Sequence, residues 1–251
     1  MAIISRHPFP VVAHFDRVAA VSYAFPEELL RPMVEPALEL DTFQGLGFVT
    51  VAMVWTRRLR PAGFPAFLGQ DFFLSGYRIF TRLRDESGRR LRGLKIIRSE
   101  TDRRRMVWSG NLLTEYRYRY VRVAVEHIVD STHVRTTRPG GALSLDLTFT
   151  TTTEDTPPPA GSPFPDWHTA RQFAGPMPFT FSPRPDGRVV VVQGTRESWR
   201  PRPVAVQNWQ VALFEEPPFR GTSPILANAF AVENIDYRWE RGRLVKPSPA
   251  P

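Results

Sequence analysis

The chain contains no cysteine among its 251 residues. Disulfide bonds, thiolate catalysis and cysteine-based zinc sites are therefore excluded. Histidine is also scarce, and its five copies are dispersed without HxH, HxxxH or HExxH spacing, so we expect no metal site. No GxGxxG or phosphate-binding loop occurs, and no Ser/His/Asp elbow, so we expect no cofactor and no serine-hydrolase triad.

Lysine is nearly absent. Lys95 and Lys246 are the only two lysines among 33 basic residues, and the rest are arginines. Because arginine stays protonated and is no amine nucleophile, chemistry that needs a lysine amine in the folded body depends on Lys95.

Long hydrophobic runs are missing as well. Hydrophobic residues make up 42% of the chain, yet no run reaches the length of a membrane span. Charges interrupt the apolar N-terminus, and no small-residue cleavage site follows it. We therefore expect a globular, cytoplasmic protein with no membrane partner.

The net charge of +8 raises the question of nucleic-acid binding. The arginines are scattered, however, with only short groups at 57–60, 89–92 and 103–105, and the chain holds 25 prolines. Arginine and proline in such excess over lysine are typical of a GC-rich genome. We expect no nucleic-acid partner, and arginines that are solvated or line a pocket.

The stretch from Tyr23 to Val54 indicates a strand end, a short helix, a turn and a long strand. Pro26 followed by Glu27 and Glu28 suits a first helical turn. The later segment 48–55 is apolar on both faces, which predicts a central strand that is covered on both sides.

Residues 70–84 and 89–100 predict a hairpin around a four-residue turn, Asp85–Gly88. Pairing Arg84 with Arg89 would place Arg78 opposite Lys95. Facing like charges are unfavourable unless an acid lies nearby.

The remaining pattern predicts further strands, one helix and one long loop. The helix is expected at 165–175, the loop at 153–165, and strands near 114–126, 133–135, 143–149, 179–193 and 227–239. We expect one domain over residues 1–246, a disordered tail at 247–251, and a mainly β fold with minor α, either an antiparallel β-barrel or stacked sheets with flanking short helices.

Three segments carry a family resemblance: residues 26–54 (PEELLRPMVEPALELDTFQG…FVTVAMV), 96–102 (IIRSETD) and 179–204. Together they resemble the YqjF-like family of uncharacterised bacterial proteins. The first segment is also similar to acetoacetate decarboxylase. The resemblance implies an acetoacetate-decarboxylase-like antiparallel β-barrel with a small-molecule pocket.

In that decarboxylase a lysine forms an imine with a keto acid, and a neighbouring lysine lowers its pKa. The resemblance places this lysine pair just after residues 96–102. Arg103, Arg104 and Arg105 stand there instead. Arginine cannot form the imine, so the decarboxylase reaction loses its main support.

Lys95 is the remaining candidate for an imine, with Arg78 as the cation that lowers its pKa. The alternative is a strand lysine that faces outward. Arg98, Glu100, Asp102 and Arg103 form a dense charged group after the same strand. They either hold an acidic ligand through an arginine fork or form a solvent-exposed salt-bridge network.

Tyr116 and Tyr118 alternate with arginines along one strand and either line a pocket or cover the sheet. Arg196 lies in the late family-like segment, where Glu197 either orients it toward a ligand or forms a structural ion pair with it.

These residues leave three hypotheses open. The leading one is a protein that binds a small, anionic organic molecule, such as a carboxylate, in the cavity of its barrel. The alternatives are a Schiff-base lyase that uses Lys95 and a non-catalytic structural or interaction protein. A homo-oligomer is compatible with all three.

Overall fold

The computed structural model describes residues 6–153, 155–175 and 177–248. The helical elements are α1 (Glu27–Leu30), η1 (Arg31–Met33), η2 (Ala66–Leu68), α2 (Arg104–Leu113), α3 (Trp167–Ala174) and η3 (Ala212–Glu215). The strands are β1 (Val11–Pro26), β2 (Glu39–Leu40), β3 (Leu46–Pro61), β4 (Gln70–Arg84), β5 (Arg90–Thr101), β6 (Tyr118–Tyr120), β7 (Arg122–Ile128), β8 (Ser131–Thr137), β9 (Leu143–Thr151), β10 (Phe179–Pro183), β11 (Val189–Arg196), β12 (Arg202–Val211), β13 (Ile225–Trp239) and β14 (Arg243–Val245).

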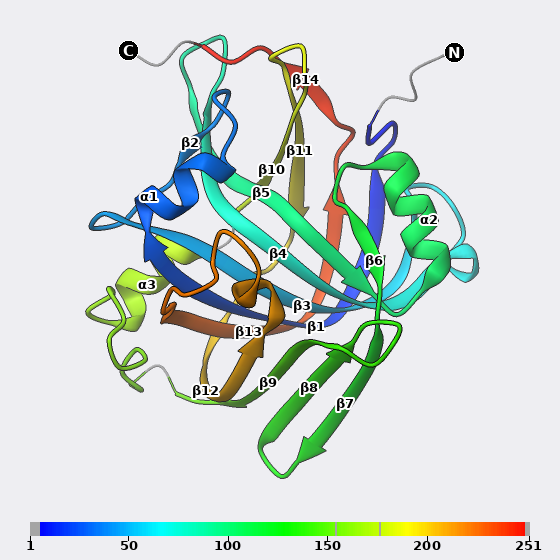
Figure 1. The fold of residues 1–251 in the computed structure, drawn as a ribbon. Helices are drawn as coiled ribbons and strands as arrows, with labels where there is room; N and C mark the ends of the chain where they lie inside the picture. Colours follow the sequence, from blue (N-terminus) through cyan, green and yellow to red (C-terminus); the bar gives the residue numbers. More distant parts are fainter. Residues whose placement is uncertain (1–5, 154, 176, 249–251) are drawn as a thin grey trace.

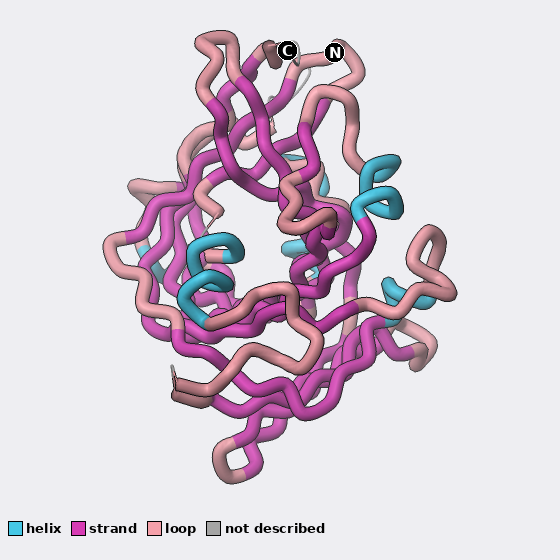
Figure 2. Tube along the Cα trace, turned by 90° about the vertical axis from the view of Figure 1, so that its left-hand side faces the viewer, coloured by secondary structure: helices cyan, strands magenta, loops and turns pink. Residues whose placement is uncertain are grey.

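Strands pair edge to edge in a closed ring. The order around it is β1, β3, β4, β5, β10, β11 and β13, and β13 pairs with both β1 and β11. The ring is antiparallel except where β5 and β10 run parallel. Figure 2 looks into this ring from the side of α3. The expected mainly β fold is confirmed, with mixed rather than wholly antiparallel pairing.

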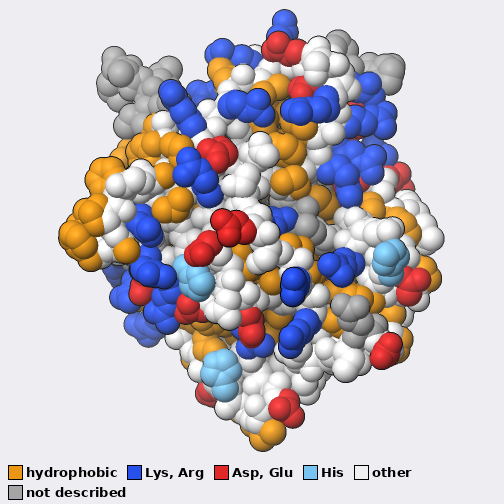
Figure 3. Space-filling model, turned by 180° about the vertical axis from the view of Figure 1, so that it is seen from behind, with side chains coloured by type: hydrophobic (Ala, Val, Ile, Leu, Met, Phe, Trp, Pro, Cys, Tyr) orange, Lys and Arg blue, Asp and Glu red, His pale blue; other side chains and the backbone are white. Residues whose placement is uncertain are grey.

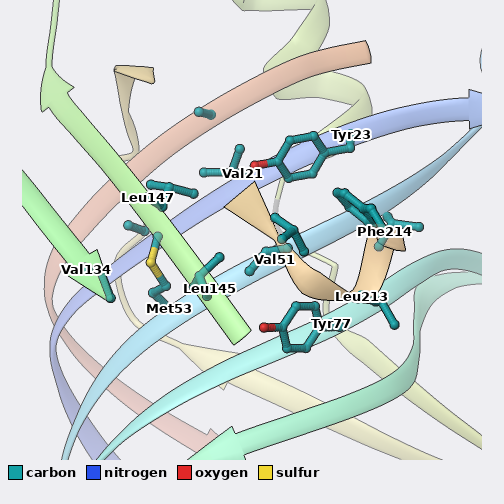
Figure 4. Close-up of a cluster of buried hydrophobic side chains, with 14 of the residues drawn as sticks. Val21, Tyr23, Val51, Met53, Tyr77, Val134, Leu145, Leu147, Leu213 and Phe214 are labelled. Carbon is teal, nitrogen blue, oxygen red and sulfur yellow. The ribbon is translucent and has the colours of Figure 1, made fainter. Parts of the chain in front are cut away.

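A second layer, formed by β7, β8, β9 and β12, packs on the outer face of the ring (Figure 1). Successive side chains of β3 alternate between two environments, the core between the two layers and the inside of the ring. Val51 and Met53 enter the core between the layers (Figure 4), whereas Ala52 and Val54 face the inside of the ring. The predicted central strand is therefore confirmed. It is apolar on both faces because one face meets a packed core and the other lines a hollow.

Helices lie at opposite ends of the ring: α3 at the left and α2 at the right of Figure 1. The predicted helix α3 begins after Asp166, whose side chain accepts from the Thr169 N–H at 2.7 Å. Phe173 of α3 packs against Phe48 and Phe80 inside that end of the ring.

The helix α2 is not predicted from the sequence. It begins with arginines, has no side-chain cap, and carries no acidic residue in its first turn, so the usual start signals are missing. It forms because Met106 and Gly110, one turn apart, are buried against the strands.

The predicted register of the β4–β5 hairpin is wrong by one residue. Arg84 pairs with Arg90, Arg78 with Ile96, and Ile79 with Lys95. The loop holds five residues rather than four, because the Asp85 N–H bonds to the Arg89 carbonyl at 3.0 Å. A one-residue shift moves every side chain to the other face. Lys95 and Arg78 therefore point to opposite sides of the sheet.

The predicted strand over 114–126 is two strands, β6 and β7, which pair with different partners. The sequence analysis also missed β12, whose pattern Pro203 interrupts. In the predicted tail, the Ser248 N–H donates to the Arg84 carbonyl at 3.0 Å, while residues 249–251 lie outside the described part. None of the described helices has the length and apolar character needed to cross a membrane.

Candidate functional site

The inside of the ring holds a cavity of about 300 Å³. Its wall is built from the inward-facing side chains of the ring strands, from the buried side of α2 and from the end of α3. Most of these side chains are apolar, and they include Val18, Ala20, Ala52, Val54, Phe72, Leu74, Phe80, Leu94, Ile96, Met106, Val192 and Phe230.

The charged groups in this wall have one sign. Arg60, Arg78 and Arg196 are its charged residues, and His7 lines the cavity as a further polar group. Among the described residues no aspartate, glutamate or lysine lines it. An apolar cavity with several guanidinium groups and no carboxylate favours a ligand that is negatively charged and partly hydrophobic.

Arg78 is the most isolated of these cations. Its guanidinium lies over Gly76, where an added Cβ would come within 2.9 Å of Nη2. Nε is buried without a hydrogen-bond partner, and within residues 6–153, 155–175 and 177–248 no carboxylate pairs with the side chain. Burial lowers the pKa of Arg78, and the neighbouring Tyr237 opposes that shift. The side chain is half-buried, and it faces the cavity.

Tyr116 and Tyr118 lie in the wall beside Arg78. The Tyr116 hydroxyl bonds to Thr180 Oγ1 at 2.8 Å. Asn111 of α2 holds the Tyr118 backbone at both its N–H and its carbonyl. Burial raises the pKa of Tyr118 to about 12 and raises that of Tyr116 as well. Both hydroxyls therefore stay protonated at neutral pH. Of the two alternatives left open by the sequence, lining a pocket and covering the sheet, both tyrosines adopt the first.

Arg196 lies where β11 meets β13 and closes the ring. Its guanidinium carbon is 4.3 Å from the Trp199 ring centre and 5.9 Å from that of Tyr237. No ion pair or hydrogen bond joins it to Glu197 in the part of the chain that the structure describes, so neither of the two roles considered for Glu197 is seen there. Aromatic rings hold Arg196 instead.

Lys95 does not line the cavity. Its Nζ lies 2.7 Å from Glu35 Oε2 and also donates to the Met33 carbonyl. The predicted pairing with Arg78 is therefore wrong, for the reason of register given above. Lys95 lines a separate polar pocket of about 350 Å³ with Arg6, Glu35 and Glu115.

Arg98, Glu100 and Arg103 also lie outside the cavity wall. Glu100 is fully buried and accepts hydrogen bonds from the hydroxyls of Tyr77 (3.1 Å) and Ser144 (2.7 Å). Arg98 is buried as well. These two are not part of a solvent-exposed network but join the ring to the second layer.

Arg98 forms an ion pair with Glu216, and Arg138 bonds the same carboxylate at 2.7 Å. Arg103 is exposed, and its Nε donates to the Asp71 carbonyl at 3.1 Å. Asp102 accepts from the Phe73 N–H at 2.9 Å. Each of these polar groups has a structural partner outside the cavity.

The sequence analysis missed two residues of the site. Tyr237 interacts with both Arg78 and Arg196, and its hydroxyl lies so close to Gly194 that an added Cβ would approach it to 1.8 Å. The alternating aromatic residues near the end of β13 are the signal that could have found it. The other is His7, whose ring centre is 5.0 Å from that of Tyr116.

His7 is buried, 8% exposed, and its backbone bonds to Leu113 and Gly242. Burial, with a smaller contribution from Arg6, lowers the pKa of His7 from 6.5 to about 4. Between these values the unfolded chain binds the proton and the folded chain does not. The free energy of unfolding therefore falls as the pH drops from about 6.5 toward about 4.

We expect the loss in free energy of unfolding between neutral and acid pH to be about 1–3 kcal/mol smaller in His7→Phe than in the wild type. Phenylalanine keeps a ring against Tyr116 and cannot be protonated. Urea unfolding at about pH 7 and about pH 4.5 measures the effect. The exposed His168→Phe serves as the control and should behave like the wild type. Equal losses in the wild type and in His7→Phe would contradict the assignment.

Metal-ligating side chains do not gather in the described ranges: no three of the His, Asp and Glu residues there are placed to hold one ion.

The sequence model of the family DUF2071, described as an uncharacterized conserved protein, matches residues 13–233. No curated protein matches the chain.

Solved structures of similar fold include MppR, an enduracididine biosynthesis enzyme, complexed with the condensation product of pyruvate and imidazole 4-carboxaldehyde. That structure has a TM-score of 0.62 and 12% identity, and the match covers 94% of this chain and 89% of that one. Acetoacetate decarboxylase from Legionella pneumophila has a TM-score of 0.61 and 14% identity, with 97% and 90% coverage. An acetoacetate decarboxylase-like enzyme from Sphingomonas wittichii RW1 has a TM-score of 0.61 and 10% identity, with 99% and 96% coverage. The expected acetoacetate-decarboxylase-like fold is confirmed.

Proposed function

The chain belongs to the DUF2071 family of uncharacterized conserved proteins, and we propose that it binds a small organic acid inside its ring of strands. The observation that carries this proposal is Arg78, an unpaired guanidinium in a cavity whose described wall contains no acid. The carboxylate of the ligand pairs with Arg78, and its hydrocarbon part fills the apolar remainder.

The energetics of Arg78 favour an anionic ligand. A buried charge is unfavourable unless it is paired and hydrogen-bonded. A carboxylate supplies both, because its two oxygens match the fork of a guanidinium. The protonated hydroxyls of Tyr118 and Tyr237 line the same cavity and can donate further hydrogen bonds to the ligand. Arg196 adds a second positive charge in the same wall.

The size of the cavity suits a small molecule. At about 300 Å³ it is at the lower end of the range for ligand pockets. A fold relative supports the same class of ligand, because one MppR structure is complexed with pyruvate, which is itself a carboxylate. At 12% identity the likeness concerns the fold alone.

The Schiff-base alternative rests on Lys95. Imine formation needs an unprotonated amine that reaches the keto group, and the Lys95 ammonium is bound to Glu35 outside the cavity. We therefore propose binding, with no lysine chemistry in the cavity.

A thermal-shift screen of small carboxylic acids, each paired with its primary amide, tests the proposal. We expect acids to raise the melting temperature and the amides to leave it unchanged. At a ligand concentration 100 times Kd, a binding acid adds about 2.7 kcal/mol to the free energy of unfolding. Amides that stabilise as well as acids, or a panel without any stabilising acid, would overturn it.

Borohydride reduction in the presence of pyruvate or acetoacetate separates the alternative. We expect no adduct by mass spectrometry. An adduct on Lys95 that is lost in Lys95→Met would instead establish the imine, and it would require the Glu35 ion pair to open.

A further inference from the structure

A group of large hydrophobic side chains is exposed at the α2 end of the ring. Phe67 is 83% exposed, Trp108 70%, Phe64 55% and Leu68 51%; we call these four residues the apolar tip. They come from the β3–β4 loop and from α2. Figure 3 shows hydrophobic side chains gathered at its left edge, on the side that carries α2 in Figure 1. Exposed apolar groups of this kind usually mark an interaction surface.

The two segments of the tip are joined by contacts at their bases. Leu59 and Phe72, which flank the loop, pack with Met106 of α2. Arg103, just before α2, donates its Nε to the Asp71 carbonyl at 3.1 Å. The loop and the helix therefore present their exposed side chains on one side of the molecule.

The loop is built to expose these side chains. Within it the Leu68 and Gly69 N–H groups bond to the carbonyls of Pro65 and Ala66. Gly69 packs so closely on Arg58 that an added Cβ would lie 2.6 Å from its backbone. Arg58 itself adopts a φ of +51°, which a non-glycine residue holds only where the surroundings enforce it.

Arginines surround the tip. Arg60 donates to the carbonyl of Phe64 at 2.9 Å. The others at the bases of the two segments are Arg57, Arg58, Arg103, Arg104 and Arg105, all exposed. Nearby acids are fewer: Asp71 and Asp16 pair with Arg57. Figure 3 shows Lys and Arg side chains directly below the hydrophobic ones at the left edge.

We propose that the apolar tip and its arginines dock on the surface of an anionic lipid bilayer. Phenylalanine, leucine and tryptophan enter the boundary between headgroups and acyl chains, and arginines bind the anionic headgroups around them. The overall charge of +8 favours the same surface. This docking is peripheral and needs no spanning helix, and it departs from the sequence-based expectation that the protein has no membrane partner.

Charge favours a bilayer over a second copy of the chain. A two-fold contact through the tip would bring the same arginines of both copies together, and facing like charges oppose association. An anionic bilayer meets the same surface with the opposite charge.

Docking here also brings the cavity close to the lipid. Phe9, Arg60, Pro61 and Gln70 line the α2 end of the cavity and flank the tip. An amphiphilic acid at the bilayer surface would then meet the cavity wall directly. Of the three cavity arginines only Arg60 also flanks the tip. The docking itself does not depend on the proposed ligand site, because Arg78, which carries that proposal, and Arg196 lie away from the tip.

Co-sedimentation of the ligand-free protein with vesicles tests the proposal. We expect binding to mixed phosphatidylserine–phosphatidylcholine vesicles that weakens as salt rises, and little binding to phosphatidylcholine alone. Phe67→Ser combined with Leu68→Ser should weaken binding by at least about tenfold. Arg104→Gln with Arg105→Gln should weaken binding to the anionic vesicles.

Matched variants elsewhere on the chain provide the controls. Ile128 and Val129, which are 58% and 95% exposed at the β7–β8 turn, are changed together to serine, and Arg89 and Arg90 together to glutamine. Both should bind vesicles like the wild type. The proposal is overturned if the wild type binds no vesicle, or if the control pairs weaken binding as much as the changes at the tip. It is also overturned if the wild type does not bind vesicles but dimerises in ultracentrifugation, and the Phe67/Leu68 change abolishes that dimerisation.

Discussion

Replacing Arg78 with methionine is expected to stabilise the protein and, at the same time, to abolish its binding of carboxylic acids. The guanidinium of Arg78 faces the cavity without a carboxylate partner in the described chain. Methionine has a similar length and removes the buried charge, which favours the folded state by about 1–4 kcal/mol. Each kcal/mol raises the melting temperature of a domain of this size by about 2–4 °C.

The same change removes the group that would hold the carboxylate. Calorimetric titration with an acid that stabilises the wild type should therefore show no binding to Arg78→Met. A variant that gains stability and loses binding is typical of a residue kept for function rather than for folding.

Arg98→Met is the matched control. Arg98 lies on the neighbouring strand, points to the opposite face, and pairs with Glu216. Its removal should destabilise the protein by about 1–3 kcal/mol, reduced because Arg138 still neutralises Glu216, and should leave acid binding intact. If Arg78→Met destabilises the protein as Arg98→Met does, Arg78 has a structural role, and the proposal that it binds a carboxylate ligand is contradicted.

The second large effect concerns Asp41. This carboxylate is fully buried and pairs with Arg82 and Arg92, with Arg92 Nε at 2.7 Å. The two arginines face each other across β4 and β5. Asp41→Asn removes the charge that keeps them together. We expect it to destabilise the protein by about 3–5 kcal/mol, a fall in melting temperature of about 6–20 °C.

A double-mutant cycle checks this assignment in urea unfolding. Arg82→Gln in the Asp41→Asn background should cost less than Arg82→Gln alone, because the like-charge contact is relieved. Asp236→Asn, whose carboxylate side chain is 83% exposed, should change stability by less than about 0.5 kcal/mol. Additive changes at Asp41 and Arg82 would show that the two do not interact.

The Asp41 cluster also shows where sequence reasoning reached its limit. Facing like charges on the β4–β5 hairpin were expected to need a nearby acid, and they have one. The acid lies far away in sequence, before β3, and it serves Arg82 and Arg92 rather than Arg78 and Lys95. Local patterns predict the hairpin, but its register depends on the number of residues in the connecting loop.

The amino-acid sequence by itself determined the mainly β fold, the family, the long central strand and the absence of thiol chemistry. These follow from composition, from short-range periodicity and from motifs, all of which are written along the chain. It also left one lysine as the only candidate for an imine in the folded body.

Only the tertiary structure decided which charges share a cavity. A one-residue shift in register sent Arg78 inward and Lys95 outward, and closure of the ring between β11 and β13 brought Arg196 and Tyr237 into the same wall. Side-chain direction alternates along a strand, so a site built from several strands depends on each register at once. No pattern within one strand contains that information.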